Sequence, residues 1–403
     1  MKISQRAQAI SPFFAMEFGK KAAQMTAQGQ QVIQLNLGEP DFGAPPAVIE
    51  AAKRLMDGRS LAYTSALGLP ELRQKIAEFY QQQHGVNIHP SRIIVTAGAS
   101  AALLLLTAAL VDHGDEVIVG DPSYPCNRQF LSSFGAKVNL VATDAASNYQ
   151  LSSELVKSHW TAETTGLMIA TPSNPTGTSI DIDELKQICE WARTHHAWRI
   201  IDEIYLNLAD PDAEGNVPQT VLSFDSDAIV INSFSKYFGM TGWRLGWCVV
   251  PEKLVPILEN MAQNYFICPS TIAQYALECF TEESLAVCEQ RRLMFIERRN
   301  LVLAGLKQMG LPVPVVPNGA FYIYFDVRGT GLTAWQFCEQ VLQEAHVALT
   351  PGKDFGVCGA EHYVRLSYAA STEQLSQAVQ RLAQFMQQFS LEQQQLKQPS
   401  TAL

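Results

Sequence analysis

Between about residue 90 and residue 250, the chain alternates short apolar, β-branched runs with longer stretches whose apolar residues recur at helical spacing. This alternation is typical of βαβ units, which build a parallel sheet covered by helices on both faces. The expected strands are residues 92–96, 116–119, 137–141, 166–170, 199–202, 228–231 and 245–250. Residues that follow parallel strands gather at one edge of the sheet, where binding and catalytic residues are expected.

A second, smaller α/β region is expected after a long helix over residues 282–309. It contains apolar runs at 320–325, 347–349 and 363–367 and helices near 335–344 and 374–389. A chain of 403 residues exceeds the size at which one hydrophobic core stops growing, so two domains are the default. The expected fold class is therefore α/β, with a large domain built on a mainly parallel, helix-covered sheet and a smaller α/β domain.

Composition excludes several classes of partner. The net charge of -10 and the pI of about 5.3 argue against a nucleic-acid partner. The longest apolar run, residues 101–111, is too short to span a bilayer, and the N-terminus lacks the apolar region of a secretory signal. The eight cysteines are scattered without the paired spacing of a metal site. We expect a cytoplasmic protein with no metal, membrane or nucleic-acid partner.

One lysine and one arginine stand in an otherwise uncharged, aromatic and glycine-rich segment, residues 233–244. An amine held among apolar side chains loses solvation of its charged form and becomes a better nucleophile. Lys236 is thus a candidate anchor for an aldehyde cofactor, and Ser233 and Arg244 offer donors to a phosphate. The alternative is an ordinary structural lysine, because most lysines are solvated.

Further positions after expected strands suit the same chemistry. Asp202 can keep a pyridine nitrogen protonated, and the Tyr205 hydroxyl and Asn174 amide can donate to a phenolic oxygen. Ala99 and Ser100 open a helix, whose N-terminal N–H groups and dipole favour a phosphate. Each position has a structural alternative: a turn for Asp202 and Asn174, a buried core tyrosine, and close helix–sheet packing for the small residues.

Arg365 alternates with apolar residues on the expected strand 363–367. An arginine on a strand is usually a solvated edge residue. The functional alternative is a two-point clamp on a substrate carboxylate.

Taken together, these residues resemble the class I aminotransferases of pyridoxal-phosphate fold type I, over residues 4–389. The motifs occur in the family's order at residues 36–42, at Tyr63 with 68–73, and at 172–177, 202–205, 233–236 and 364–367. The resemblance implies a two-step (ping-pong) aldimine mechanism that moves an amino group between an L-amino acid and a 2-keto acid. It implies that Lys236 is Schiff-base anchor and general base, and that Asp202 pairs with the ring nitrogen.

The resemblance also implies a set of binding residues for pyridoxal 5'-phosphate and substrate. The phenolic oxygen would meet Asn174 and Tyr205, the ring would stack on Tyr124, and the phosphate would be held by Ala99, Ser100, Ser233 and Arg244. The substrate carboxylate would be bound by Gly38, Asn174 and Arg365, and Tyr63 would reach the phosphate of the neighbouring subunit. A homodimer with shared active sites is implied.

The same resemblance sets the expected domain boundaries. Residues 1–45 would form an N-terminal arm and part of the small domain, and residues 46–295 the large cofactor-binding domain. Residues 296–390 would form the small C-terminal domain, followed by a polar tail over 391–403.

Two alternatives and the choice of substrate stay open. A carbon–sulfur β-lyase of the same fold would keep Lys236, Asp202 and Arg365 but release ammonia and pyruvate, whereas a cofactor-binding regulator would need an added DNA-binding domain. Ser100 stands where aspartate-preferring relatives often carry a lysine. Phe13, Phe14, Tyr124 and Phe321, expected near the pocket, favour a neutral or aromatic amino donor.

Overall fold

The computed structural model describes residues 1–212 and 215–397 and divides into two compact units. Unit 1 comprises Met1–Ser11, Glu39–Leu293 and Pro317–Ala320. Unit 2 comprises Pro12–Gly38, Met294–Val316 and the chain from Phe321 on. Each unit has its own sheet structure, so the two are described separately.

Unit 1 is built on a seven-stranded sheet with the strand order β2-β8-β7-β6-β5-β3-β4. The strands are β2 (Ile93–Thr96), β3 (Glu116–Asp121), β4 (Lys137–Ala142), β5 (Thr164–Ala170), β6 (Trp198–Asp202), β7 (Ile229–Ser233) and β8 (Gly246–Val249). Every neighbouring pair is parallel except those of β8, which runs antiparallel to β2 and β7. The expected strands and the mainly parallel sheet are confirmed. The exception follows from the connection, because no α-helix lies between β7 and β8 to carry a parallel crossover.

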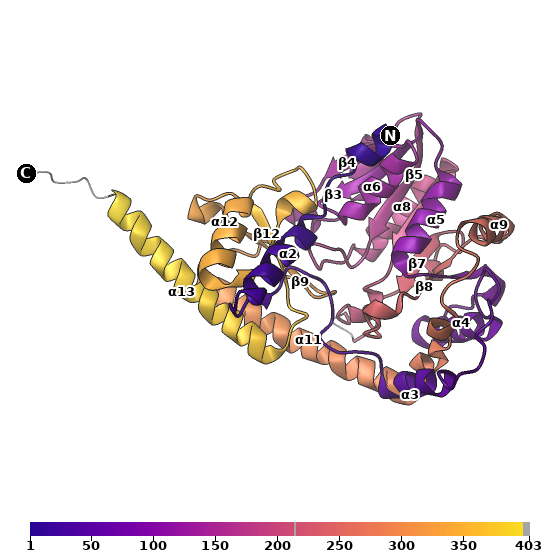
Figure 1. The fold of residues 1–403 in the computed structure, drawn as a ribbon. Helices are drawn as coiled ribbons and strands as arrows, with labels where there is room; N and C mark the ends of the chain where they lie inside the picture. Colours follow the sequence, from indigo (N-terminus) through magenta and orange to yellow (C-terminus); the bar gives the residue numbers. More distant parts are fainter. Residues whose placement is uncertain (213–214, 398–403) are drawn as a thin grey trace, which may run out of the picture. The chain divides into compact units, whose positions relative to one another are not determined.

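Helices cover both faces of this sheet (Figure 1). They are α5 (Ala99–Leu110), α6 (Pro125–Ser133), α7 (Ser153–Ser158), α8 (Ile182–Thr194) and α9 (Val255–Tyr265), with α1 (Gln5–Ala9), α3 (Pro46–Leu55), α4 (Pro70–His84) and α10 (Thr271–Gln274) also in this unit. Cys248 of β8 lies in one core cluster with Leu103 of α5 and Leu258 of α9. The next residue along, Trp247, donates from Nε1 to Tyr80 Oη of α4 at 3.3 Å. Successive strand residues point to opposite faces, so α5 and α4 cover different faces.

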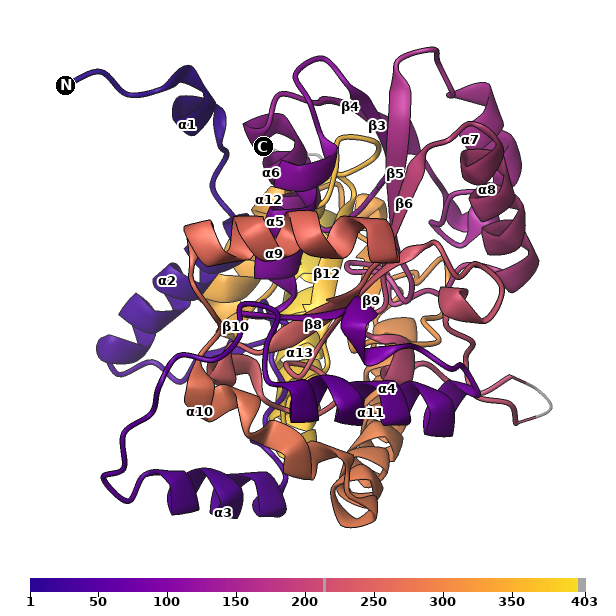
Figure 2. The same cartoon turned by 90° about the vertical axis from the view of Figure 1, so that its right-hand side faces the viewer.

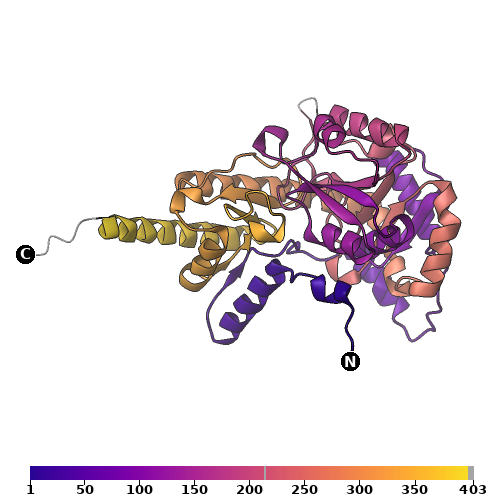
Figure 3. The same ribbon diagram turned by 90° about the horizontal axis from the view of Figure 1, so that it is seen from above.

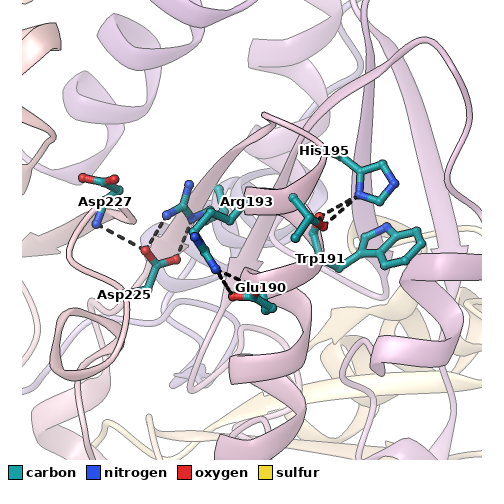
Figure 4. Close-up of polar contacts among 8 residues, drawn as sticks. Glu190, Trp191, Arg193, His195, Asp225 and Asp227 are labelled. Carbon is teal, nitrogen blue, oxygen red and sulfur yellow. Dashed lines mark hydrogen bonds and ion pairs between the residues drawn. The ribbon is translucent and has the colours of Figure 1, made fainter.

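A buried ion pair fixes β6 within the sheet. Arg199 of β6 donates from Nε and Nη2 to the carboxylate of Asp225, and both side chains are only 7% exposed. Figure 4 shows that Asp225 also accepts from the backbone N–H of Asp227 at 3.2 Å, beside the exposed pair of Arg193 with Glu190 on α8. Removing one partner of a buried pair is strongly destabilising, so this contact holds the strand that leads into the candidate site.

Unit 2 contains two small sheets. An antiparallel sheet has the order β11-β12-β9, and β1 pairs with β10 in parallel. The elements are β1 (Ile33–Gln34), β9 (Tyr322–Asp326), β10 (Val347–Ala348), β11 (Thr350–Pro351), β12 (Tyr363–Ser367), α2 (Phe14–Ala27), α12 (Ala334–Gln340) and α13 (Thr372–Lys397), and α11 (Glu282–Gln308) ends in this unit.

The last helix is longer than expected. Residues 374–389 were predicted to be helical, but α13 extends to Lys397 (Figure 3). The added residues are mostly glutamine, glutamate, leucine and lysine, which are good helix formers. Residues 398–403 of the expected polar tail lie outside the described residues.

Across residues 1–212 and 215–397, no helix combines the length and the apolar character needed to cross a membrane. The same residues contain no group of three or more His, Cys, Asp or Glu arranged to hold a metal ion.

Candidate active site

The carboxyl ends of β2, β3, β5, β6 and β7 lie at one edge of the unit 1 sheet. β3, β5, β6 and β7 pair in parallel, and β2 shares their direction because both β2 and β7 are antiparallel to β8. The expected unit 1 site residues follow these ends: Ala99 and Ser100 after β2, Tyr124 after β3, Asn174 after β5, Asp202 and Tyr205 at β6, and Ser233 and Lys236 at β7. The sheet therefore brings them to a common edge, as expected for α/β sites.

Arg244 lies against Gly98 at the start of α5. A Cβ on Gly98 would come within 2.7 Å of Arg244 Nη2, so any other side chain would push the guanidinium away. Gly98 has a φ of 85° and precedes the first helical residues, Ala99 and Ser100. Arg244 Nη1 donates to the carbonyl oxygen of Thr241 at 2.9 Å. A guanidinium held beside a helix N-terminus fits a phosphate group.

Two serines, Ser233 and Ser235, bond to each other at the end of β7. Ser233 is 1% exposed, and its Oγ bonds to the carbonyl oxygen of Leu245 at 3.1 Å and to Ser235 Oγ at 2.9 Å. The backbone N–H of Ser235 donates back to Ser233 Oγ at 3.0 Å. Ser235 was missed in the sequence analysis, although its spacing of two residues from Ser233 and its place before Lys236 were the available signals.

β8 passes close to the start of α5. A Cβ on Gly246 would lie 2.8 Å from the backbone nitrogen of Ala99. Glycine is therefore required for this close approach, which brings the Arg244 end of β8 to the helix N-terminus.

Asp202 is a buried carboxylate close to Lys236. It is 8% exposed, and its Oδ1 accepts from the backbone N–H of Ile204 at 3.1 Å. Burial raises the pKa of Asp202 to about 6, while the Ile204 N–H and the positive charge of Lys236 act in the opposite direction. The two expected catalytic residues thus interact electrostatically. A buried carboxylate of this kind favours a cationic partner, as a protonated ring nitrogen would be.

The neighbouring Glu203 is a second buried carboxyl group and was not expected. It is 1% exposed and accepts from Thr220 Oγ1 and from the backbone N–H of Val221, both at 2.7 Å. Burial raises the pKa of Glu203 to about 7, and the nearby Asp202 acts in the same direction. These bonds attach the end of β6 to the segment that precedes β7.

The remaining unit 1 residues have different degrees of burial. Asn174 and Tyr205 are buried at 7% and 5% exposure, whereas Tyr124 and Lys236 are partly exposed. The segment that carries Asn174 is closed by bonds from Ser173 N to Thr178 O (3.0 Å) and from Gly177 N to Ser173 O (2.8 Å). Tyr63 lies between α3 and α4 and is 79% exposed.

In unit 2, Arg365 is buried rather than solvated. It is 2% exposed, and its guanidinium carbon lies 4.5 Å from the ring centre of Tyr322 and 4.7 Å from that of Phe355. Nη2 donates to the backbone carbonyl of Asn36 and, at 3.4 Å, to Thr350 Oγ1. The solvated-edge alternative for Arg365 is therefore wrong. A guanidinium held this firmly suits recognition of a planar anion.

Gly38 and Arg365 border the same tyrosine. A Cβ on Gly38 would lie 1.6 Å from Tyr322 Oη, so the hydroxyl occupies the space that a side chain would need. Neither Tyr322 nor Phe355 was predicted as a site residue. The available signal for Tyr322 was the run of aromatic residues within the expected strand 320–325. In the structure this run lies mostly in β9, which pairs with β12, the strand of Arg365.

One expectation about the substrate pocket is wrong. Phe321 has no exposed surface, because its ring packs against Phe295 at 5.4 Å and Tyr322 at 5.0 Å between ring centres. It belongs to the core of unit 2 rather than to a pocket wall. Phe14, also expected near the pocket, packs edge-on against Trp335 at 5.3 Å. Phe321 therefore gives no support to an aromatic amino donor, whereas Phe13, Phe14 and Tyr124 stay partly exposed.

The raised pKa of Asp202 predicts how pH affects the stability of the cofactor-free protein. The folded state keeps the proton that the unfolded state loses near the ordinary pKa of 3.8, so this contribution to stability is full below that pH and is lost as the pH rises through about 6. Asp202→Asn has no such proton to lose. The unfolding free energy of Asp202→Asn minus that of the wild type should therefore rise by up to about 3 kcal/mol between about pH 4 and pH 7.

Urea unfolding of both proteins at several pH values measures this difference. Asp227→Asn, at an exposed carboxyl in the same unit, is the matched control and should follow the wild type. Parallel pH profiles for Asp202→Asn and wild type would contradict the prediction.

With this geometry established, comparisons with known proteins give a consistent result. The family model described as aminotransferase class I and II matches residues 30–382. The chain is 34% identical over 380 residues to the valine–pyruvate aminotransferase of Mycobacterium tuberculosis, covering 94% of this chain and 97% of that protein. It is 36% identical over 384 residues to the aspartate aminotransferase of Thermotoga maritima, covering 95% and 99%. Among solved structures, the aspartate aminotransferase of Thermus thermophilus with maleate matches at a TM-score of 0.90 and 34% identity, covering 95% and 99%.

Proposed function

Because this chain belongs to the aminotransferase class I and II family, whose members depend on pyridoxal 5'-phosphate, we propose that Lys236 and the residues around it carry out its transamination. The chain is an aminotransferase. The observation that carries the assignment of its site is that Lys236 and Asp202 interact at the same sheet edge that holds the cradle of Gly98 and Arg244.

When bound, pyridoxal phosphate supplies an aldehyde carbon that bonds to amines and a ring that withdraws electrons. Lys236 Nζ would hold the aldehyde group of the cofactor, and its amine would serve as the base that accepts and returns the α-proton of the amino donor. Asp202 keeps the ring nitrogen protonated, since its buried carboxylate is stabilised by a cationic neighbour. The same residues act in reverse on the keto acid.

The other unit 1 residues bind and orient the cofactor. The Asn174 amide and the Tyr205 hydroxyl donate to the phenolic oxygen and stabilise its negative charge. Tyr124 stacks on the ring. The phosphate is bound by Arg244, Ser233, Ser100 and the backbone N–H of Ala99, and the cradle geometry at Gly98 supports this assignment.

Arg365 is proposed to bind the substrate α-carboxylate, together with the Gly38 backbone. Its support is the burial of the guanidinium, which lies over the rings of Tyr322 and Phe355. A buried charge of this kind is well suited to a carboxylate that brings the opposite charge.

A neutral L-amino acid with a single carboxylate is the proposed amino donor. Ser100 and Phe13 add no positive charge that could bind a second carboxylate. The valine–pyruvate relative supports this choice, whereas the name of the aspartate relative points to the alternative. Pyruvate and 2-oxoglutarate are the proposed acceptors.

A matrix of amino donors against keto acids, read by product formation, tests the proposal. Valine, alanine, phenylalanine and aspartate are each paired with pyruvate and with 2-oxoglutarate. We expect neutral donors to exceed aspartate in kcat/KM. A clear preference for aspartate would overturn the substrate proposal, and ammonia release from cysteine or cystathionine without a keto acid would favour the β-lyase alternative.

A homodimer with shared active sites is proposed as the working form. Its support is the exposure of large apolar side chains in unit 1, with Tyr63 at 79%, Met56 at 71% and Tyr265 at 60%. Apolar side chains mark a protein interface when they form one contiguous exposed patch, and Met56 and Tyr63 are close neighbours in the chain. Sedimentation velocity of the purified protein tests this proposal, and a monomer at micromolar concentration would contradict it.

Gly98→Ala is expected to weaken cofactor binding by about 10-fold to 100-fold. The added Cβ would lie 2.7 Å from Arg244 Nη2 and displace the guanidinium from the phosphate. Gly114→Ala is the matched control, because Gly114 also has a positive φ but nothing lies within 4 Å of its Cβ position. Titration of cofactor-free protein with pyridoxal phosphate measures the effect. Equal affinities for the two variants would rule out a role for the contact between Gly98 and Arg244.

A further inference from the structure

The segment that carries Tyr63, residues 62–69, is held by a buried glutamine. Gln274, the last residue of α10, has no exposed surface, although it is polar and lies far from Tyr63 in the sequence. Its Oε1 accepts from the backbone N–H of Leu69 at 2.8 Å. Its Nε2 donates to Thr64 Oγ1 at 2.9 Å and to the carbonyl of Pro269 at 3.1 Å. Both ends of the side-chain amide are therefore bonded, and two of the three bonds go to the Tyr63 segment.

A second residue of α10 fixes the other side of Tyr63. Thr271 Oγ1 donates to the carbonyl oxygen of Ala62 at 2.9 Å. The residues before and after Tyr63 are thus both bonded to α10, a helix that also contacts α3 (Figure 2). The side chain of Tyr63 itself is 79% exposed. The backbone is held firmly while the aromatic side chain projects outward.

The far end of the segment is anchored on the sheet. The backbone N–H of Val95 in β2 donates to the carbonyl of Leu67 at 3.0 Å. Gly68 follows with a φ of 98°, and a Cβ there would lie 2.5 Å from the Val95 side chain and 3.2 Å from Gln274 Oε1. This close packing leaves the chain no room to shift away from Gln274.

We propose that Gln274 is a positioning residue for the reaction, which holds Tyr63 in the orientation needed to meet the cofactor phosphate of the second subunit. The inference rests on the proposed homodimer and on the proposed role of Tyr63. Ordering a segment before association removes the entropy loss that would otherwise oppose binding. The buried Gln274 amide, which bonds Thr64 and Leu69 after Tyr63, provides this ordering within each subunit.

A double-mutant cycle on cofactor binding tests the inference. The proteins are wild type, Tyr63→Phe, Gln274→Leu and the double variant, each stripped of cofactor and titrated with pyridoxal phosphate. Each single substitution is expected to raise the dissociation constant by about 10-fold. The double variant is expected to match the weaker-binding single variant within about 2-fold, because Gln274 acts through Tyr63. If the two effects multiply, so that the dissociation constant of the double variant rises by about 100-fold, the inference is overturned.

The cycle separates failure of this inference from failure of the proposed function. If Tyr63→Phe weakens cofactor binding and Gln274→Leu does not, the inference fails and the role of Tyr63 stands. If Tyr63→Phe leaves the dissociation constant unchanged, the proposed role of Tyr63 fails and the inference falls with it, while the assignment of Lys236 is unaffected.

Two further measurements keep the test independent of folding defects. Gln263→Leu replaces an exposed glutamine on α9 and should bind cofactor like the wild type. Thr64→Val removes one acceptor of the Gln274 amide with little change in volume, and should weaken cofactor binding in the same direction as Gln274→Leu. Hydrogen exchange of the Leu69 amide should become faster in Gln274→Leu, and unchanged exchange would contradict the proposed anchoring.

Discussion

Lys236→Ala is expected to lower kcat for transamination by about 10⁴-fold or more, because the variant would lose the proposed covalent anchor and the proposed proton carrier together. No other residue at the sheet edge is proposed to move the α-proton. Asp202 is proposed to pair with the ring nitrogen, and the Asn174 amide is proposed as a donor to the phenolic oxygen. The substitution should also abolish the visible absorption of the lysine-bound cofactor.

Steady-state rates and absorption spectra of the purified variant measure both effects. Lys253→Ala, at an exposed lysine of the same unit, is the matched control and should behave like the wild type. Cofactor binding through the phosphate cradle should persist in Lys236→Ala, since Arg244, Ser233 and Gly98 are unchanged. A variant that kept both the absorption and the activity would remove the central assignment.

Arg365→Leu is expected to lower kcat/KM for amino acids by roughly 10²–10⁴-fold, the size expected for losing charged hydrogen bonds to a buried carboxylate. Arg365→Lys should recover only part of this loss. A lysine keeps the charge but cannot present two parallel donors, and it lacks the planar guanidinium that lies over the rings of Tyr322 and Phe355.

The substrate provides the sharpest control for Arg365. With a primary amine that lacks a carboxylate, Arg365→Leu and wild type should react at similar rates, because no carboxylate remains to be bound. Arg328→Leu, at an arginine with 58% side-chain exposure in the same unit, should leave kcat/KM unchanged. An equal loss with both kinds of substrate would assign Arg365 to the structure of unit 2 rather than to carboxylate binding.

Much of the fold could be predicted because its signals are local. The β-branched runs at 199–202 and 228–231 fall within one or two residues of β6 and β7, and the motif that ends in Lys236 follows directly from β7. The exception in the sheet, antiparallel β8, depends on the connection between β7 and β8 rather than on the composition of the strand. The end of α13 was misjudged because polar helix formers resemble a frayed tail.

The surroundings of the site residues were harder to predict, because they come from distant parts of the chain. Arg365 was recognised as a possible carboxylate clamp, but its neighbours Tyr322 and Phe355 were not. Phe321 was expected in a pocket and lies in the core, because its ring packs against Phe295 and Tyr322 just before β9 begins. Whether a strand residue faces a ligand or the core depends on what packs on each side, and a single sequence does not record this.

The sequence by itself determined the fold class, the family and the residue types of the site, because strand periodicity and strand-end motifs are encoded over a few neighbouring residues. Only the tertiary structure decided the environment of each group. It buried Asp202 close to Lys236. It also bonded Arg365 to a backbone carbonyl 329 residues away and Gln274 to Leu69 across 205 residues. Desolvation and hydrogen bonding act through space, so contacts of this sequence separation appear only when the chain is folded.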